Sequence, residues 1–350
     1  MKYGLIVHQV TKNVGDDIQA LATSYFLPKI DYIINRERLD SFTSDKQEPV
    51  AVLMPGWYLW NKWNWPPSEY IVPKFISFHY SNRTVGRRTD EPFEELFLTG
   101  LGKDYMNVYG PIGARDYYTQ EWLKNLGIKT YFSSCITTTL PNMPETSDKG
   151  QYICFVDVKY SQVENVIESS ASAAGIQIKK ITHNVPKKFF KESWTKRKKR
   201  AEQILTTYQN ARCVITTRLH CALPCLAMGV PVLLVSEDES GHRFIPFYDW
   251  LHVGKPSEII SGSFKYDIIN PPANKSAHIP YREELIKNAK TFVEEVGKPE
   301  NLSKYQKAFP HKDLMAWRHD NMKKVLSAWG TIRRKEYKEI VELKKTKSNS

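Results

Sequence analysis

The sequence predicts an α/β protein with two Rossmann-like domains, whose parallel sheets face each other across a cleft. Short apolar runs alternate with amphipathic segments along the first half of the chain, and the same alternation restarts after residue 150. Strands that alternate with helices in this way form parallel sheets with right-handed crossovers. The length of 350 residues also corresponds to two domains rather than one.

In the first half, residues 3–10 have the apolar content of a strand, and residues 11–15 form a polar turn. Asp16 is predicted to cap a helix that extends to residue 27, because apolar residues recur on one face of it at helical spacing. The other elements expected here are strands at 31–34, 50–54, 74–78 and 129–132 and a helix at 115–126, ended by Gly127.

A cluster of helix- and strand-breaking residues at 141–150 marks the predicted domain boundary. We expect an N-terminal domain at 1–148, a C-terminal domain at 149–310, and C-terminal helices of which the last, at 311–350, packs back toward the N-terminal domain. The elements expected after the boundary are strands at 152–156, 178–181, 213–216 and 231–235 and helices at 162–174, 193–210, 281–295 and 314–344, with a further helix that ends at Gly229.

The chain has a formal charge of +12, much of it in two helix-like stretches at 196–200 and 333–347. A solvated helix face is the favoured interpretation, and contact with a membrane that carries a lipid-linked acceptor is the alternative. Nucleic acid is a weaker third choice, because no basic stripe is interleaved with aromatic residues. No stretch approaches the roughly 20 apolar residues of a membrane span, and the N-terminal apolar run is too short for a signal peptide. We therefore expect a cytoplasmic protein, with the inner face of the membrane as the alternative location.

The cysteines are expected to be buried, reduced thiols. Their number is odd and no CxxC pair occurs, and their spacing offers too few ligands for zinc, so no metal site is expected. They are Cys135, Cys154, Cys213, Cys221 and Cys225.

The strongest candidate site lies in the segment 214–235. Ligands of open parallel sheets bind beyond the carboxyl ends of the strands, and here a strand leads into Thr217, Arg218, Leu219 and His220 at the start of a helix. A helix N-terminus favours an anion, an arginine binds phosphate or carboxylate, and a histidine transfers protons near neutral pH. Equally weighted is a structural interpretation, in which the arginine pairs with a local carboxylate and the histidine packs against the helix.

Two further segments follow predicted strands. Arg115 begins the helix at 115–126, where it is expected either to reach a ligand or to orient Asp116, whose own expected role is helix capping. Asn13, Asp16 and Asp17 follow the first strand. For these carboxylates, helix capping by Asp16 is favoured over contact with a substrate hydroxyl.

Together the three segments resemble the polysaccharide pyruvyl transferase family. Residues 13–16 look like the family's N-x-G-D start, residues 113–116 look like its central arginine–acid motif, and residues 217–235 look like its R-L-H segment followed by A-x-x-x-G-x-P. The R-L-H segment is the specific part of the resemblance, which covers most of the chain.

The resemblance implies a glycosyltransferase-B-like fold and an enzyme that moves the pyruvyl group of phosphoenolpyruvate onto a saccharide as a ketal. It implies no cofactor. Arg218 and Arg115 then bind the donor, together with Thr217 and Leu219. His220 is the expected general acid, and Asp16 or Asp17 is the expected base. The N-terminal domain is expected on the acceptor side, and the C-terminal domain on the donor side.

Asn13 and Asp17 are expected to bind the acceptor. The sequence departs from the family pattern in a group of four tryptophans at 57, 60, 63 and 65. Trp57 and Trp60 are expected to stack on sugar rings, and a loop cluster packed against the core is an equally weighted interpretation. The competing functions are a nucleotide-sugar-dependent glycosyltransferase of the same fold and a non-catalytic saccharide- or anion-binding protein.

Overall fold

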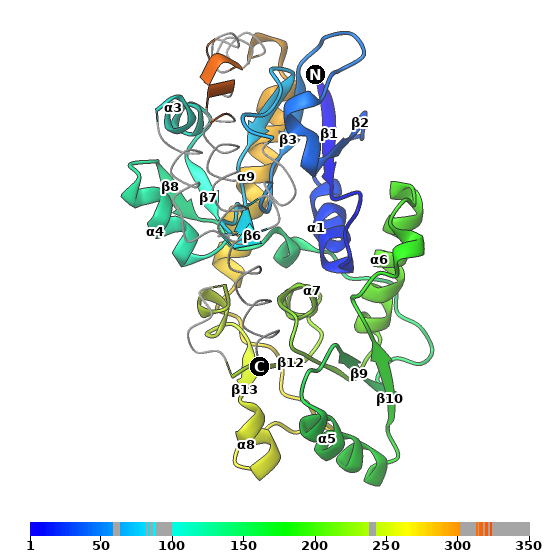
Figure 1. The fold of residues 1–350 in the computed structure, drawn as a ribbon. Helices are drawn as coiled ribbons and strands as arrows, with labels where there is room; N and C mark the ends of the chain where they lie inside the picture. The colour runs from blue at the N-terminus through cyan, green and yellow to red at the C-terminus, as the bar shows by residue number, and fades with distance from the viewer. Residues whose placement is uncertain are drawn as a thin grey trace, which may run out of the picture.

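The computed structural model describes residues 1–58, 64–81, 83–84, 87–88, 100–237 and 243–301, with single positions and short runs at 313, 315–317, 319–320 and 323. Figure 1 shows an upper half that contains the N-terminal strands and a lower half that contains the strands after residue 150. The α/β class with parallel sheets, predicted from the alternation of elements, is confirmed.

The first sheet has four parallel strands in the order β2-β1-β3-β4. They are β1 (Lys2–Val7), β2 (Tyr32–Asn35), β3 (Val50–Leu53) and β4 (Ile71–Lys74). Helix α1 (Val14–Ser24) connects β1 to β2. The prediction of a strand at 74–78 was wrong, because β4 ends where it was expected to begin. Pro73 obscured the strand in the sequence, since proline cannot donate to a sheet ladder.

Past β4 the chain extends this sheet through single bridges. Phe78 pairs in parallel with Gly56 on one side and with Ala114 on the other. The elements that follow are the antiparallel pair β5 (Arg83–Thr84) and β6 (Arg87–Arg88), helix α3 (Leu101–Val108), β7 (Ile112–Ala114), α4 (Tyr117–Asn125), β8 (Thr130–Phe132) and the 3₁₀ helix η2 (Ile136–Thr139). The residues after β4 therefore lie beside the end of β7.

The second sheet is parallel throughout, in the order β10-β9-β11-β12-β13. Its strands are β9 (Tyr152–Val156), β10 (Gln177–Ile181), β11 (Cys213–Thr216), β12 (Val232–Val235) and β13 (His252–Gly254). Its helices are α5 (Ser161–Ala173), α6 (Trp194–Gln209), α7 (Leu219–Ala227) and α8 (Pro256–Ser261). The strand order reverses between β9 and β11, and such a reversal opens a crevice at the carboxyl ends.

Helix α9 (Ile279–Gly297) follows the second sheet in the chain but packs on the first half (Figure 1). Its backbone accepts a hydrogen bond from the Tyr3 hydroxyl at Val293, and its Asn288 side chain donates to the Tyr131 hydroxyl. The return to the N-terminal half thus begins before the predicted boundary at residue 310. Most of the predicted helix at 314–344 lies outside the described residues, although Trp317 packs against the N-terminal aromatic core.

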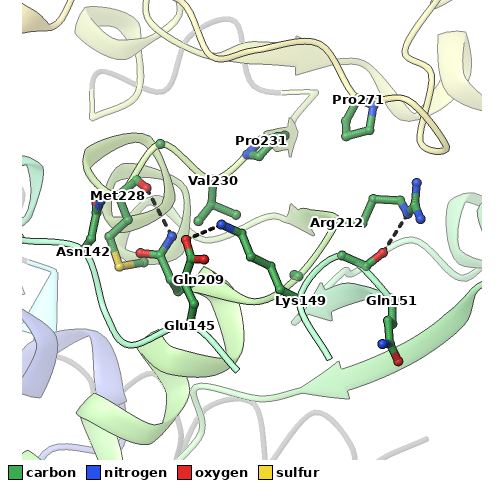
Figure 2. A pocket seen from close by; sticks show the side chains of 13 residues that line it. Asn142, Glu145, Lys149, Gln151, Gln209, Arg212, Met228, Val230, Pro231 and Pro271 are labelled. Atoms are coloured by element: carbon green, nitrogen blue, oxygen red, sulfur yellow. Dashed lines mark hydrogen bonds and ion pairs between the residues drawn. The ribbon is translucent and has the colours of Figure 1, made fainter. Parts of the chain in front are cut away.

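A cavity of about 560 Å³ lies at the amino ends of β9, β11 and β12 (Figure 2). Its charged side chains are already paired. Lys149 binds Glu145, and Arg212 donates to the carbonyl oxygens of Gly150 and Ile269. This cavity is at the edge opposite to the one where parallel sheets bind ligands, so we do not regard it as the active site.

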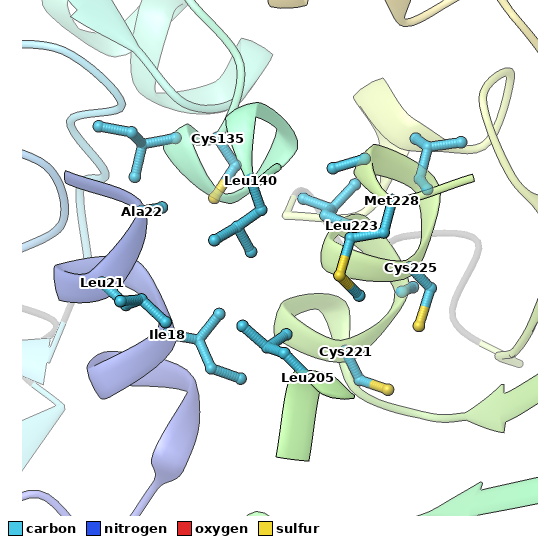
Figure 3. Packing of buried hydrophobic residues seen from close by; sticks show 14 of the residues in the cluster. Ile18, Leu21, Ala22, Cys135, Leu140, Leu205, Cys221, Leu223, Cys225 and Met228 are labelled. Carbon is cyan, nitrogen blue, oxygen red and sulfur yellow. The ribbon is translucent and has the colours of Figure 1, made fainter. Parts of the chain in front are cut away.

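The two halves share one apolar core beneath their junction. Figure 3 shows helix α1 facing helix α7 across this core, with the α6 side chain of Leu205 between them. The labelled contributors are Ile18, Leu21, Ala22, Cys135, Leu140, Leu205, Cys221, Leu223, Cys225 and Met228. All five cysteines are buried and free, as predicted. Apolar packing therefore holds the N-termini of α1 and α7 in a fixed relation.

Candidate active site

The turn after β1 joins the two halves directly. Asn13 caps α1 by accepting a hydrogen bond from the backbone N–H of Gly15, at 3.1 Å. The prediction that Asp16 is the cap was wrong, since Asp16 lies within the first turn of the helix. Asn13 also forms an antiparallel bridge with Asn184, and the backbone N–H of Val14 donates to the carbonyl oxygen of His183 at 2.9 Å. Asn13 therefore lies at the contact between the loop after β1 and the loop after β10.

The Asp16 carboxylate is surrounded by donors. Oδ2 accepts from the Thr11 hydroxyl and lies 3.3 Å from His8 Nδ1, and Oδ1 lies 3.5 Å from the Arg36 guanidinium. Burial by itself raises the pKa of Asp16, but Arg36, His8 and Thr11 together hold this pKa well below its usual range. Asp16 is therefore ionised and a weak base.

Asp17 points away from Asp16 and into the structure. Its side chain is 1% exposed and forms an ion pair with Arg197 of α6, which also donates to the backbone oxygen of His8 at 2.7 Å. Burial raises the pKa of Asp17 against the opposing effect of Arg197. The structure thus places Asp17 in a buried link between α1 and α6, without exposure to a substrate.

Arg115 is a buried cation with unused donors. It follows β7, its backbone N–H donates to Phe78 at 2.8 Å, and the residue is only 3% exposed. Its Nε and one Nη atom are buried and have no hydrogen-bond partner among the described residues, although Asp116 lies 3.6 Å away. Buried guanidinium nitrogens that make no hydrogen bond are costly, so Arg115 has the properties of an anion-binding group.

Asp116 caps α4, as predicted from the sequence. Its Oδ1 accepts from the backbone N–H and the hydroxyl of Thr119, at 2.9 Å and 2.7 Å. Its Oδ2 lies 2.7 Å from His79 Nδ1. Burial raises the pKa of Asp116, but its bond to His79 and the charge of Arg115 lower it far more. Asp116 therefore remains ionised beside His79.

His220 lies in the first turn of α7, packed against the start of α1. A Cβ atom placed on Gly15 would lie 2.9 Å from His220 Cβ and 3.0 Å from its Nδ1, so only glycine permits this contact. Its Nε2 is buried and has no partner among the described residues. Burial, followed by the charge of Arg115, lowers the pKa of His220 to about 3, and Asp16 opposes this shift. His220 is therefore neutral at pH 7.

The rest of the R-L-H segment has mixed roles. Arg218 Nε donates to Asp157 Oδ2 at 3.0 Å, and one Nη lies 3.4 Å from the Asn184 side chain. The Arg218 side chain is 31% exposed, so the local carboxylate considered as an alternative is present but does not enclose it. Thr217 donates to the Asp157 backbone at 2.6 Å. Leu219 is buried in the shared core, so its side chain is not exposed to a donor substrate.

A third arginine enters the site from the loop after β12. Arg243 interacts electrostatically with Arg115, Asp116 and Asp16. Arg243 is exposed. Even so, desolvation by the surrounding protein is the main cause that lowers its pKa to about 10, followed by the charge of Arg115.

Two of the four tryptophans, Trp57 and Trp65, lie in the described part of the chain, and both are buried. Trp57 is 1% exposed and contacts the rings of Phe78 and Tyr80 edge-on, at 5.9 Å and 5.6 Å. Trp65 is fully buried in the same aromatic core. Trp57 therefore has no free face for a sugar, and the interpretation as a packed loop cluster holds for these two. Trp60 and Trp63 lie outside the described residues.

Arg115 and Asp16 both interact electrostatically with His220, and two residues that the sequence analysis missed, His79 and Arg243, interact with Arg115. Neither belongs to a recognisable motif. The available signal for His79 was its place just after the strand expected at 74–78. Together these groups form a cation-rich cluster with two histidines. Within the described residues, no group of three or more His, Cys, Asp or Glu side chains is arranged to hold a metal ion, and no helix is long and apolar enough to span a membrane.

Comparison with known proteins identifies the family of the chain. No curated protein matches the chain. A solved structure of a functionally uncharacterised protein from Klebsiella pneumoniae subsp. pneumoniae NTUH-K2044 is similar at 13% identity and a TM-score of 0.38, over 70% of this chain and 88% of that one. The profile described as polysaccharide pyruvyl transferase matches residues 13–239, which include Asn13, Arg115 and His220. The chain belongs to the polysaccharide pyruvyl transferase family and is a transferase of polysaccharide biosynthesis that acts on a saccharide.

Proposed function

We propose that this enzyme transfers the pyruvyl group of phosphoenolpyruvate to two hydroxyls of a saccharide, forming a cyclic ketal and releasing phosphate. The observation that carries this proposal is the buried guanidinium of Arg115, in which two nitrogens make no hydrogen bond, beside His220 and Arg243. Phosphoenolpyruvate carries a phosphate and a carboxylate, and such a compact anion requires several converging cations.

The electrostatics of the site support an anionic donor. The positive charge of Arg115 contributes to the lowered pKa values of His220, His79 and Arg243, which marks a strongly positive local potential. A bound anion offsets the repulsion between these positive groups. It also provides hydrogen-bond acceptors for the Nε and Nη of Arg115 that make no hydrogen bond. Arg218 supplies a further cation from the opposite half, held by Asp157 and open on one side.

His220 is the proposed general acid. The reaction requires a proton on the methylene carbon of the donor, which makes the central carbon electrophilic. Before the donor binds, His220 is neutral, because burial and Arg115 oppose its protonation. Donor binding adds negative charge beside Arg115 and raises the pKa of His220, so the acid forms together with the donor complex. Asp16 favours the same protonated state and acts as the electrostatic partner of His220.

The acceptor is proposed to enter from the first half of the chain. A hollow of about 330 Å³ lies between the end of β1 and the start of α6. Phe190 and Trp194 give it aromatic surface, and Gln9 and Ser193 give it hydrogen-bonding groups. His8 separates this hollow from Asp16, since its side chain contacts Asp16 while its chain neighbours line the hollow. This hollow replaces Trp57 as the proposed sugar surface.

The larger architecture follows from the same proposal. The junction of the two sheets acts as the cleft of a two-domain, glycosyltransferase-B-like enzyme, with the donor held at the start of α7. The enzyme is proposed to act in the cytoplasm, and a lipid-linked acceptor brings it to the inner face of the membrane. Exposed lysines near the start of α6, Lys187, Lys188, Lys191, Lys196 and Lys199, are suited to contact anionic headgroups there.

The donor is tested by thermal unfolding against phosphoenolpyruvate, UDP- and GDP-sugars, and inorganic phosphate. A ligand at about 100 times its Kd adds roughly 2.7 kcal/mol to the free energy of unfolding. We expect the largest rise in Tm with phosphoenolpyruvate, and a smaller rise at equal concentration in Arg218→Ala. A rise with nucleotide sugars alone would contradict the proposal and assign a glycosyltransferase.

A further inference from the structure

Ketal formation requires a proton acceptor for the attacking hydroxyl as well as a proton donor for the methylene carbon. Asp16, the base expected from the sequence, is poorly suited to this role. Its two oxygens already face Thr11, His8 and Arg36, so neither is free to accept a proton from the acceptor hydroxyl. The proposed function therefore leaves the base unassigned.

His79 and Asp116 form a pair with the geometry of an oriented proton acceptor. His79 Nδ1 lies 2.7 Å from Asp116 Oδ2, and both residues are buried, at 7% and 0% exposure. Because Asp116 is ionised, it accepts from Nδ1–H and so fixes the tautomer in which Nε2 carries the lone pair. The His79 ring makes this one side-chain hydrogen bond within the described residues, which leaves Nε2 available.

The Asp116 carboxylate is itself immobilised. Its other oxygen accepts two hydrogen bonds from Thr119, and the residue is the cap of α4. The backbone of His79 is also fixed, since its N–H donates to Gly56 at 3.1 Å. The cap of α4 is already satisfied by Thr119, so the bond between Asp116 and His79 is not needed for capping. Its effect is to fix the His79 ring, whose backbone is held as well.

His79 lies beside Arg115 of the proposed donor site, because the Arg115 backbone N–H donates to the Phe78 carbonyl oxygen at 2.8 Å and the Asp116 carboxylate lies 2.7 Å from His79 and 3.6 Å from Arg115. It follows Phe78, whose backbone lies between Gly56 and Ala114, at the carboxyl-end edge of the extended first sheet. The charges of Arg115 and Arg243 both act on it, as they act on His220. Burial and then Arg115 lower the pKa of His79 to about 3 despite Asp116, so before the donor binds the ring is neutral and only weakly basic. A donor anion beside Arg115 makes it more basic.

We infer that His79 is the catalytic base of the transfer and that Asp116 is its positioning residue; this rests on the proposed function. In the first step, an acceptor O–H bond breaks, its proton passes to His79 Nε2, and the oxygen bonds to the central carbon while His220 protonates the methylene carbon. In the second step, the carbon–phosphate oxygen bond breaks and the departing phosphate takes the proton from His79. The second hydroxyl then closes the ring and returns its proton to His220, so both histidines recover their starting states.

Two substitutions separate catalysis from folding. In His79→Asn the side-chain amide N–H takes the position of Nδ1–H and keeps the bond to Asp116, while Nε2 is lost. Asp116→Asn keeps an oxygen for the Thr119 cap but presents an N–H to His79, which reverses the tautomer. His252→Asn, at a histidine in β13 that bonds the Ala273 carbonyl oxygen, is the matched control.

The measurement is phosphate release from phosphoenolpyruvate with methyl glycosides of glucose, galactose and mannose as acceptors, across pH 5–9, beside the Tm shift given by phosphoenolpyruvate. A general base contributes about 10²- to 10⁴-fold. We expect His79→Asn to lower kcat at least 100-fold with the Tm shift retained. For Asp116→Asn we expect a lower kcat, a displaced pH profile and an unchanged KM for the donor, and for His252→Asn no change.

The outcomes distinguish the two claims. If the wild type turns over and His79→Asn stays within threefold of it with the same pH profile, the assignment of His79 is wrong while the proposed function stands. If phosphoenolpyruvate neither raises the Tm of the wild type nor releases phosphate with any glycoside, the proposed function fails, and the assignment of His79 fails with it.

Discussion

Gly15 and His220 are in contact across the junction of the two halves, and the missing Cβ of Gly15 is what allows it. A Cβ atom at this position would lie 2.9 Å from His220 Cβ, which is closer than side chains approach. The first turn of α1 thus determines where the proposed acid of α7 can lie.

Gly15→Ala is expected to reduce turnover far more than its effect on a helix would suggest. Alanine favours a helix over glycine by about 1 kcal/mol, so a loss of activity must come from displacement of His220. A shift of about 1 Å in a catalytic group costs on the order of 100-fold in rate. Phosphate release and Tm measured together check this prediction, and unchanged turnover would show that His220 does not depend on this contact.

The buried ion pair between Asp17 and Arg197 is expected to stabilise the junction only while both partners are present. Asp17→Ala leaves the Arg197 charge buried, which costs about 3–5 kcal/mol in the free energy of unfolding. Lys198→Ala, which removes the exposed pair with Glu202, should cost less than about 1 kcal/mol. Urea unfolding of the two variants compares them, and equal costs would contradict the buried role of Asp17.

Acid should destabilise the protein through its neutral, buried histidines. Burial is the main cause that lowers the pKa of His183 to about 4 and of His79 and His220 to about 3. The unfolded chain binds protons near pH 6.5 while the folded chain does not, so stability is present above pH 6.5 and is lost as pH falls toward 4. The loss is on the order of 1 kcal/mol per histidine per pH unit, and less for His220, which is only half-buried.

Urea unfolding at pH 7.5, 6.5 and 5.5 measures this slope. His79→Asn removes one of the three histidines, so its free energy of unfolding should fall less steeply with acid than that of the wild type. A stability that is flat between pH 6.5 and 5.5 would show that the histidines are already protonated in the folded state.

Trp57 is expected to matter for folding rather than for acceptor binding. Its removal in Trp57→Ala empties an aromatic core position, at a cost of about 3–5 kcal/mol. Any loss of activity should track the fraction of unfolded protein, with the acceptor KM of the folded fraction unchanged. A raised KM without a change in stability would restore the sugar-stacking interpretation.

The elements that the sequence predicted well are those whose local signals agree with their packing. Strands β9, β11 and β12 are short, buried apolar runs, and α9 has a regular apolar face, so each was located within a few residues. Strand β4 was misplaced because Pro73 interrupts its pattern, and the cap of α1 was assigned to Asp16 because the sequence gives both Asn13 and Asp16 a capping side chain.

The site was predictable only where a motif marks it. Arg115 and His220 stand at helix starts after strands, which the order of elements places at one edge. His79 and Arg243 lie in irregular segments, and their nearness to Arg115 follows from tertiary packing that no local pattern records. The buried pairing of Asp17 was equally hidden, because its partner Arg197 lies 180 residues away.

The central claim is that Arg115 is kept buried, with two nitrogens that make no hydrogen bond, in order to bind the donor anion. It is tested most directly by the Tm of Arg115→Met with and without phosphoenolpyruvate, beside Arg212→Met as an arginine outside the site. Replacement of a poorly paired buried charge by an apolar side chain is often neutral or stabilising by about 1–4 kcal/mol. We expect Arg115→Met to keep or raise the Tm of the free protein and to lose the shift with phosphoenolpyruvate, which Arg212→Met retains. A lower Tm for free Arg115→Met, with the phosphoenolpyruvate shift intact, would show that Arg115 is structural and would contradict the account.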